Sequence, residues 1–247
     1  QSLLPDAYIS MGQTAENLAR YKDVSREDMD RFAVQSQNRA EKAIADGFFA
    51  REITPVTLPD GTVVDTDDGP RPGTTYDKIS QLKPVFRPDG RITAGNACPL
   101  NDGAAALVIM SDTKAEQLGV TPLARVGSTG VPGLSPEIMG YGPVEASQQA
   151  LHRAGLTIDD IDLVELNEAF AAQGLPVLKD LGFLDAMDEK VNLHGGAIAL
   201  GHPLGCSGSR ICTTLLNVMQ QRDTTLGLAT MCIGMGQGVA TVFERLK

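Results

Sequence analysis

Strand-like and helix-like segments alternate through the second half of the chain, and this order constrains the fold more than any other feature of the sequence. Apolar, strand-like segments lie near 123–128, 162–166, 226–231 and 239–244, and helical segments lie at about 143–154, 168–181 and 205–221. This βαβαβαββ order is typical of an α/β layer with a mostly parallel sheet. The loops that follow parallel strands lie at one edge of such a sheet, where ligands usually bind.

The first half of the chain is irregular and only partly helical. Residues 11–21 have helical apolar spacing, and Ser25 with Asp28 resembles a capping box that starts a helix running to about Asp46. The passage 57–75 is rich in Pro, Gly and Asp, which predicts an exposed loop. A strand-like run at 104–110 and a helix-like run at 112–119 are expected to be the tail of a second α/β unit that begins upstream.

The composition excludes several classes of partner. A formal net charge of −10 argues against nucleic acid and anionic membranes, because both require a basic surface. The longest apolar runs fall far short of the ~20 residues that span a bilayer, and we recognise no signal peptide. We therefore expect a globular protein with neither a nucleic-acid nor a membrane partner.

The cysteines and histidines do not have the spacing of a metal site. The chain has no CxxC pair among Cys98, Cys206, Cys212 and Cys232, so we predict no zinc site. Four scattered cysteines fit a reducing compartment, and we expect a cytoplasmic protein. The chain begins at Gln1 rather than at Met, so we also expect it to be a fragment of a longer protein.

Two glycine-rich segments present a histidine and a cysteine. His202 lies in GGAIALGHPLGCSG, just before a predicted helix, and Cys232 begins CIGMGQG after an apolar strand. Flanking glycines let a ligand or a second backbone come close, and an imidazole beside the cysteine would suit a thiol that exchanges protons near neutral pH. The alternatives are a loop histidine bonded to the backbone and a small buried thiol.

Three further polar residues have competing interpretations. Asn167 follows a predicted strand, where it is either a helix N-cap or a side chain that holds a water or a carbonyl oxygen. Glu168 fits the first turn of that helix better than it fits a general base. Cys98 either lines a ligand channel or occupies a turn, and we favour the turn.

These motifs, taken in order, resemble those of the thiolases, which make or cleave 3-ketoacyl-CoA. The resemblance rests on NEAFAAQ from Asn167, on the two glycine-rich segments, and on MGQTAEN and TAGNACPLNDGAAA in the first half. It covers essentially the whole chain. The segments GNACPLNDG and GLSPEIMG are most similar in sequence to those of bacterial degradative members, including actinobacterial steroid side-chain thiolases.

The resemblance implies a fold, a domain division and an activity. The fold is a thiolase-like layered domain with an irregular, partly helical loop domain, and the first α/β half is expected to be missing. The implied domains are a CoA-binding loop domain at 1–95, the tail of the N-terminal half at 96–120, and the C-terminal domain at 121–247. The implied activity is thiolytic cleavage of 3-ketoacyl-CoA to acetyl-CoA and a shortened acyl-CoA, or the reverse Claisen condensation, in fatty-acid or steroid side-chain β-oxidation.

Roles for individual residues also follow from the resemblance. His202 would activate a nucleophilic cysteine, and Cys232 would exchange the α-proton of acetyl-CoA. One oxyanion hole would use His202 and a water held by Asn167, and another would use the backbone N–H of Gly234. The family's nucleophilic cysteine matches none of the four cysteines here, so this chain alone is expected to be inactive.

The implied CoA contacts lie mainly in the first half. Arg71 would pack on the adenine, and the remaining positions would line the wall and the pantetheine and acyl path: Phe86, Ala94, Cys98, Met11, Ala169 and Phe170. Three residues differ from those that are common in the family at the same positions, namely Ser10, Cys98 and His194. The first two place the implied CoA contacts at those positions in doubt.

The implied partners are CoA and acyl-CoA as substrates, with no separate cofactor. An N-terminal thiolase half that carries the nucleophile would be a further partner, in a homodimer or homotetramer. Two other functions remain open: a non-catalytic acyl-CoA binding module, and a generic nucleotide-binding α/β domain. The second lacks both a Walker A and a GxGxxG pattern.

Overall fold

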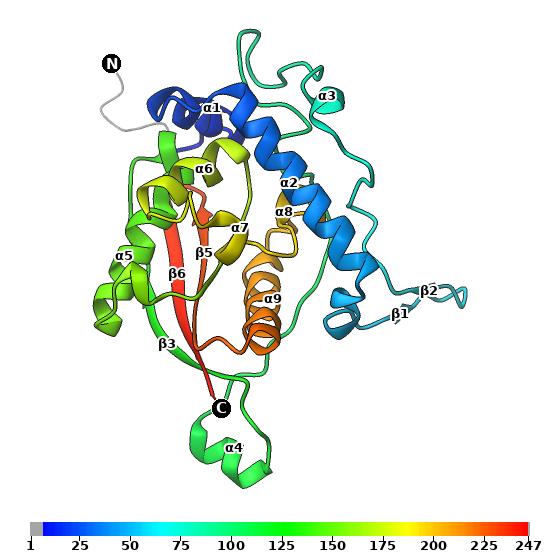
Figure 1. Ribbon diagram of the computed structural model, residues 1–247, viewed down its shortest axis with the longest axis vertical. Helices are drawn as coiled ribbons and strands as arrows, with labels where there is room; N and C mark the ends of the chain where they lie inside the picture. Colours follow the sequence, from blue (N-terminus) through cyan, green and yellow to red (C-terminus); the bar gives the residue numbers. More distant parts are fainter. Residues whose placement is uncertain (1–6, 247) are drawn as a thin grey trace.

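The computed structural model describes residues 7–246, and a four-stranded mixed sheet lies at its centre (Figure 1). The order across the sheet is β3-β6-β5-β4. The strand bounds are β3 (Ala124–Gly130), β4 (Leu163–Leu166), β5 (Leu226–Ile233) and β6 (Gln237–Arg245). All four lie at or close to the predicted positions, and the sheet is the framework on which the helices pack.

Successive side chains along β5 and β6 belong alternately to two apolar layers. Leu228 and Val242 belong to a cluster that also contains buried residues of α5 (Gly142–Ala154) and α6 (Ala171–Asp180). Their neighbours Ala229 and Phe243 belong to a second cluster, with buried residues of α9 (Ser207–Arg222). Because successive strand side chains point to opposite faces, α5 and α9 cover opposite faces of the sheet.

The prediction of a mostly parallel sheet is wrong. Only β4 and β5 pair in parallel among the described strands, whereas β6 is antiparallel to both β3 and β5. The reason is the three-residue turn 234–236 between β5 and β6. A parallel pair needs a crossover of a dozen or more residues. The turn 234–236 is much shorter, and β5 and β6 therefore form an antiparallel hairpin.

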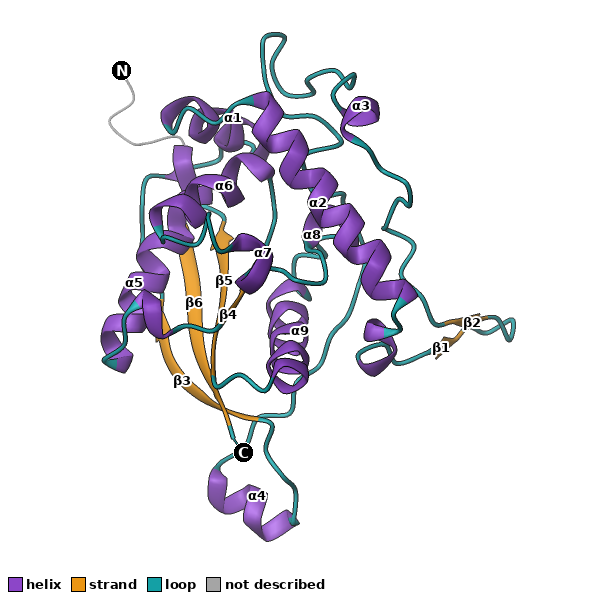
Figure 2. Ribbon diagram, viewed as in Figure 1, coloured by secondary structure: helices purple, strands orange, loops and turns teal. Residues whose placement is uncertain are grey.

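The first half supplies two helices that pack against α6. α1 (Met11–Tyr21) has the predicted bounds, and α2 (Arg26–Ala45) begins where the side chain of Ser25 accepts a hydrogen bond from the backbone N–H of Asp28. The long helix α2 crosses the molecule beside the short helix α8 (Figure 2). The other short elements are η1 (Phe48–Arg51), α3 (Tyr76–Ile79), η2 (Pro136–Tyr141), η3 (Ile158–Asp160), α7 (Met187–Lys190) and α8 (Ala197–Leu200).

Two segments project from the body of the molecule (Figure 1). The predicted exposed passage contains a two-stranded ribbon, β1 (Val56–Thr57) and β2 (Val63–Val64), whose residues are all exposed. The predicted helix at 112–119 is confirmed as α4 (Asp112–Leu118). No helix within residues 7–246 has the length and apolar content needed to span a bilayer.

The strand-like run at 104–110 does not form a strand. It pairs with no described strand, and its apolar side chains Val108 and Ile109 are mostly exposed. A strand is stabilised by its ladder hydrogen bonds and cross-strand contacts, so an apolar run without a neighbouring strand stays irregular.

The two-layer core predicts a large effect of truncating a central side chain. Leu228 is fully buried, so Leu228→Ala should lower the free energy of unfolding by about 2–5 kcal/mol in chemical denaturation. The matched control is Val126→Ala on β3, where the side chain is half exposed and the loss should stay below about 1 kcal/mol. Equal losses for the two variants would contradict this account of the core.

Candidate active site

Parallel pairing of β4 and β5 brings two predicted site residues to the same edge of the sheet. Leu166 is opposite Thr230, and the next N–H, that of Asn167, donates to the carbonyl of Thr230 at 3.0 Å. Cys232 lies two residues beyond Thr230, near the end of β5. The expected convergence at the carboxyl edge is therefore confirmed for Asn167 and Cys232.

His202 joins them from the loop between α8 and α9. Its Nε2 lies 3.4 Å from Nδ2 of Asn167, and its Nδ1 lies 2.6 Å from the Ser207 hydroxyl. The single hydroxyl proton of Ser207 goes to the carbonyl of Pro203 at 3.0 Å. The Ser207 oxygen therefore accepts from Nδ1–H, and the Nε2 lone pair is directed toward Asn167.

The electrostatics of the site favour a neutral imidazole. Burial lowers the pKa of His202, and the positive charge of Arg210 lowers it further. A neutral ring with its proton on Nδ1 can accept a proton at Nε2, which is what a general base requires. Asn167 is fully buried, and its Oδ1 accepts no hydrogen bond from the described residues, so this oxygen is available to a donor in the site.

A second contact holds the backbone of His202. Its N–H donates to Oδ1 of Asn101 at 3.2 Å. Gly201, at φ 97°, makes room for this side chain, because a Cβ there would lie 2.5 Å from the same oxygen. Neither Asn101 nor Ser207 is predicted from the sequence as a site residue. Ser207 had a local signal, a hydroxyl five residues after the histidine, whereas Asn101 is a hundred residues away in sequence.

Cys232 lies in an apolar environment rather than in an open polar loop. It packs in a small cluster with Met139 and Ala169, against which Cys98 and Phe170 also pack. Burial raises the pKa of Cys232 to about 12. The expectation of a thiol that titrates near neutral pH is therefore wrong for this structure, and the thiol is a neutral group that is suited to donating a proton.

The turn after Cys232 has one open glycine and one crowded glycine. A Cβ at Gly234 would meet no atom within 4 Å, so space is available beside its backbone. A Cβ at Gly236 would lie 2.1 Å from the carbonyl of Leu134, and φ is 86°. Gly236 thus serves the turn, while a role for the N–H of Gly234 stays a prediction.

Several predicted CoA and acyl contacts form a continuous wall next to Cys232. The N–H of Cys98 donates to the carbonyl of Ala169 at 3.0 Å, and Phe170 meets Phe86 edge to face at 6.3 Å. Phe86 lies against the start of α1, since a Cβ on Gly12, the residue after Met11, would lie 2.2 Å from its ring. Burial raises the pKa of the Cys98 thiol to about 11.

Arg71 and Ala94 are exposed. The backbone N–H of Arg71 donates to Oε1 of Gln37 at 2.9 Å, which ties the 71–76 segment to α2. Their implied roles in binding CoA stay predictions.

The predicted first-turn role of Glu168 is wrong, as is the helix start. α6 begins at Ala171, and Glu168 lies before it, nearly fully buried. Its carboxylate accepts hydrogen bonds from Ser36, from Asn192 and from the N–H of Ile198. The residue therefore satisfies buried donors from three other segments instead of the first turn of a helix. The alternative N-cap role of Asn167 is also excluded, because Phe170 occupies that position.

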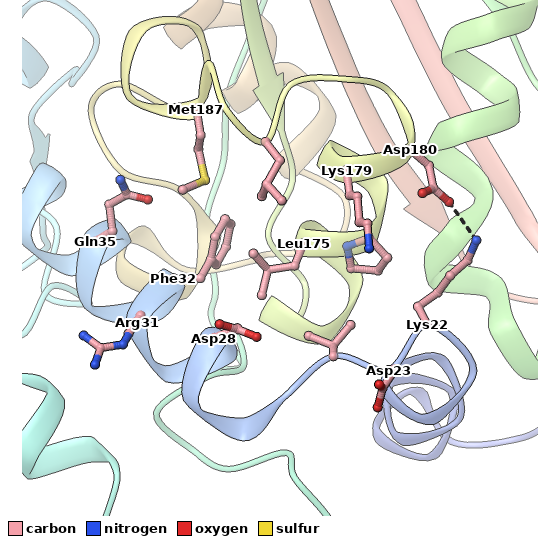
Figure 3. Close-up of a pocket in the computed structure, with 13 residues that line it drawn as sticks. Lys22, Asp23, Asp28, Arg31, Phe32, Gln35, Leu175, Lys179, Asp180 and Met187 are labelled. Atoms are coloured by element: carbon pink, nitrogen blue, oxygen red, sulfur yellow. Dashed lines mark hydrogen bonds and ion pairs between the residues drawn. The ribbon is translucent and has the colours of Figure 1, made fainter.

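A separate cavity of about 480 Å³ lies between α1, α2 and α6 (Figure 3). Phe32, Leu175 and Met187 form part of its apolar lining, and Lys22 pairs with Asp180 at its rim. None of the predicted site residues lines it. The sheet edge with His202, Asn167 and Cys232, rather than this cavity, is therefore the candidate active site.

Comparison with known proteins identifies two matching family models. The model described as thiolase, C-terminal domain, matches residues 120–245, and the model described as thiolase, N-terminal domain, matches residues 3–113. The second match does not support the expectation that the first α/β half is missing, because this part of the chain corresponds to that domain.

Individual relatives agree with these models. The 3-ketoacyl-CoA thiolase of Chromohalobacter salexigens is 60% identical over 246 residues, which cover 98% of this chain and 63% of that protein. The one from a Marinomonas species is 59% identical over 245 residues, with 97% and 63% covered. The chain thus spans just under two thirds of the length of these relatives.

Solved structures give the same result. Human mitochondrial 3-ketoacyl-CoA thiolase in complex with CoA superposes with a TM-score of 0.93 at 44% identity, covering 98% of this chain and 61% of that one. An acetyl-CoA acetyltransferase of Bacillus anthracis has a TM-score of 0.92 at 45% identity, covering 96% and 60%. The fold is therefore confirmed, although the boundaries at 95 and 120 stay predictions.

The contact between His202 and Ser207 predicts a change in tautomer. Ser207→Ala should convert a ring held with its proton on Nδ1 into a mixture of neutral tautomers, because the fixed acceptor is lost. The measurement is ¹⁵N NMR of the histidine rings, with Ser209→Ala on the same helix as the control. A ring that keeps its proton on Nδ1 in Ser207→Ala would show that another group holds it.

The raised thiol pKa values predict how alkylation depends on pH. Because the thiolate is the nucleophile, a pKa of about 12 leaves only ~10⁻⁴ of Cys232 reactive at pH 8. Alkylation of the folded chain by iodoacetamide should therefore be slow and should rise about tenfold per pH unit, with Cys98 ahead of Cys232. Peptide mass spectrometry measures both rates, and the urea-unfolded chain is the reference. Reaction of folded Cys232 at the unfolded rate near pH 7 would contradict this environment.

Proposed function

The chain belongs to the thiolase family, and we propose that it carries the acid/base part of an acyltransferase site that cleaves 3-ketoacyl-CoA with CoA. The products are acetyl-CoA and a shortened acyl-CoA, and the reverse reaction is a Claisen condensation. The observation that carries the proposal is the placement of Asn167 and Cys232 at the ends of two parallel strands, together with the 3.4 Å contact between Nδ2 of Asn167 and Nε2 of His202.

The proposed first stage uses His202 as a base and then as a donor. Nε2 takes the proton of a nucleophilic thiol, and the thiolate attacks the keto carbon of the substrate. The new Nε2–H, with a water held by Asn167, then stabilises an oxygen on which negative charge develops. The lone pair that the Ser207 contact leaves on Nε2 supports this order of events.

The proposed role of Cys232 follows from its neutral thiol. When the bond between the α-carbon and the keto carbon breaks, the enolate of acetyl-CoA takes the thiol proton at its α-carbon. The N–H of Gly234 stabilises an oxyanion of the acyl-enzyme stage, for which open space beside its backbone gives room. In the second stage the CoA thiol gives its proton to the Cys232 thiolate and attacks the acyl-enzyme. The nucleophilic thiolate that leaves takes its proton back from Nε2 of His202.

The nucleophilic thiol is assigned to a segment outside these 247 residues. None of the hydrogen bonds of the described residues joins His202 to a cysteine, and burial raises the pKa of Cys98, Cys212 and Cys232. Cys206 is buried at the start of α9. These environments support the family resemblance, in which the nucleophile matches none of the four cysteines.

The remaining proposals concern the complete protein. CoA is a substrate and no separate cofactor is needed. One similar protein, human mitochondrial 3-ketoacyl-CoA thiolase, is solved in complex with CoA. The complete enzyme acts in lipid β-oxidation in the cytoplasm, as a homodimer or homotetramer in which the N-terminal segment carries the nucleophile.

The proposal predicts separate effects on the two stages. In the complete protein, Cys232→Ala should still form the acyl-enzyme, detected by intact mass, but should lose exchange of the α-protons of acetyl-CoA by about 10²–10⁴-fold. The control is Cys212→Ala on α9, which removes a thiol that packs in the core below that helix and should leave exchange intact.

The 247-residue chain, with its mass verified, should not turn over acetoacetyl-CoA. Turnover by this chain would show that one of its own cysteines is the nucleophile. Full proton exchange in Cys232→Ala would remove Cys232 from its proposed role, and CoA binding without any chemistry in the complete protein would favour the acyl-CoA binding module.

A further inference from the structure

A buried polar cluster lies directly behind the candidate active site. Its centre is Glu168, the residue after Asn167, and its other members are Ser36 on α2 and Asn192 before the glycine-rich stretch. All three side chains are more than nine-tenths buried. Buried polar groups are costly unless they are paired, so a fully paired cluster of this kind restricts the arrangement of the segments that it joins.

The hydrogen-bond directions show what Glu168 does. The Ser36 hydroxyl donates to Oε2 at 2.6 Å, the Asn192 amide donates to Oε1 at 2.8 Å, and the N–H of Ile198 donates to Oε2 at 3.2 Å. Ser36 itself accepts from the N–H of Gly196 at 3.1 Å, so its only proton is directed to the carboxylate. All the neighbours of Glu168 are donors, and the carboxylate must therefore act as an acceptor.

Asn192 extends the cluster to the strand that carries Asn167. Its Oδ1 accepts from the N–H of Leu166 at 2.9 Å, and its Nδ2 donates to the carbonyl of Leu166 at 2.8 Å. Both polar atoms of the amide are thus used at the end of β4. These two hydrogen bonds hold Leu166 at the end of β4 and thereby set the position of Asn167, the next residue.

Ser36 and its neighbour Gln37 extend the cluster to the segment that leads to His202. The N–H groups of Gly196 and Ile198 bind the Ser36–Glu168 pair, and Nε2 of Gln37 donates to the carbonyl of Ile198 at 3.2 Å. These contacts fix α8 at its start, and its end leads through Gly201 into His202.

The packing around Glu168 and Ser36 also explains why residues 195 and 196 are both glycine. A Cβ at Gly196 would lie 2.2 Å from the carboxyl carbon of Glu168, and a Cβ at Gly195 would lie 2.7 Å from the carbonyl of Ser36. These two glycines therefore admit a buried carboxylate and a helix backbone, not a ligand.

We propose that Glu168 is a positioning residue that, through Ser36 and Asn192, sets the distance and orientation between Asn167 and Nε2 of His202. The proposal rests on the proposed function of these two residues in acyl transfer. Ser36 makes helix α2, which comes from the first half of the chain, a direct part of the support. No contact of Glu168 with substrate is required.

The test uses the 247-residue chain labelled with ¹⁵N and needs no CoA and no turnover. The variants are Ser36→Ala, which removes one donor, and Glu168→Gln, which places an amide NH₂ among donors. In Ser36→Ala, hydrogen exchange at the N–H of Gly196 should accelerate roughly tenfold, as expected for a lost hydrogen bond to the cluster. In both variants the ¹⁵Nε2 signal of His202 should shift, because the 3.4 Å contact between Nε2 and Nδ2 of Asn167 is no longer held in place.

Two controls are available in the chain itself. Ser147→Ala removes a buried hydroxyl on α5 that has no hydrogen-bond partner among residues 7–246, and it should leave the His202 signals unchanged. His152, on the last turn of the same helix, is an internal reference whose signals should not move in any variant.

Each outcome decides the proposal. Faster exchange at Gly196 with an unchanged His202 ring would reduce the cluster to a purely structural role, and unchanged exchange in Ser36→Ala would show that the hydrogen bond does not hold this segment. If Glu168→Gln does not fold, Ser36→Ala decides alone. A complete protein that lacks thiolysis while His202 still responds to Ser36→Ala would overturn the proposed function and leave the positioning role intact.

Discussion

Parallel pairing between β4 and β5 is the constraint on which the rest of the candidate site depends. Only a parallel register places the carboxyl ends of two strands at the same edge, and here it brings Asn167 beside the end of the strand that carries Cys232. The antiparallel hairpin of β5 and β6 then turns back immediately after Cys232. This turn puts the open backbone at Gly234 next to the thiol, so one pairing and one turn generate most of the geometry.

Burial explains the chemistry that this geometry supports. His202 is partly buried and Cys232 is buried, which disfavours the charged form of each, and the result is a neutral imidazole and a neutral thiol at the same edge of the sheet. A base and an acid that are both uncharged at rest suit a reaction in which a proton is first removed and later delivered. The polar requirements of the site are met by fixed partners such as Ser207 and Asn101, rather than by compensating charges.

Much of the fold could be predicted from the sequence, because its signals are local. The cap at Ser25, the bounds of α1 and the positions of the four long strands along the chain each depend on residues that are close together in sequence. The errors occurred where partners are distant. The run at 104–110 has strand composition but no described neighbouring strand, and Glu168 looked like a first-turn acid because its donors Ser36 and Asn192 lie far away in sequence.

The sequence by itself determined the family, the order of the elements and the identity of the histidine, asparagine and cysteine in the site, since these are written as contiguous motifs. The tertiary structure alone decided the mixed direction of the sheet, the tautomer of His202 and the raised pKa of Cys232. Those properties depend on which groups meet through space and how far water is excluded from them. The support behind the site is of the same kind, because a carboxylate can satisfy three donors from three segments only after the chain has folded.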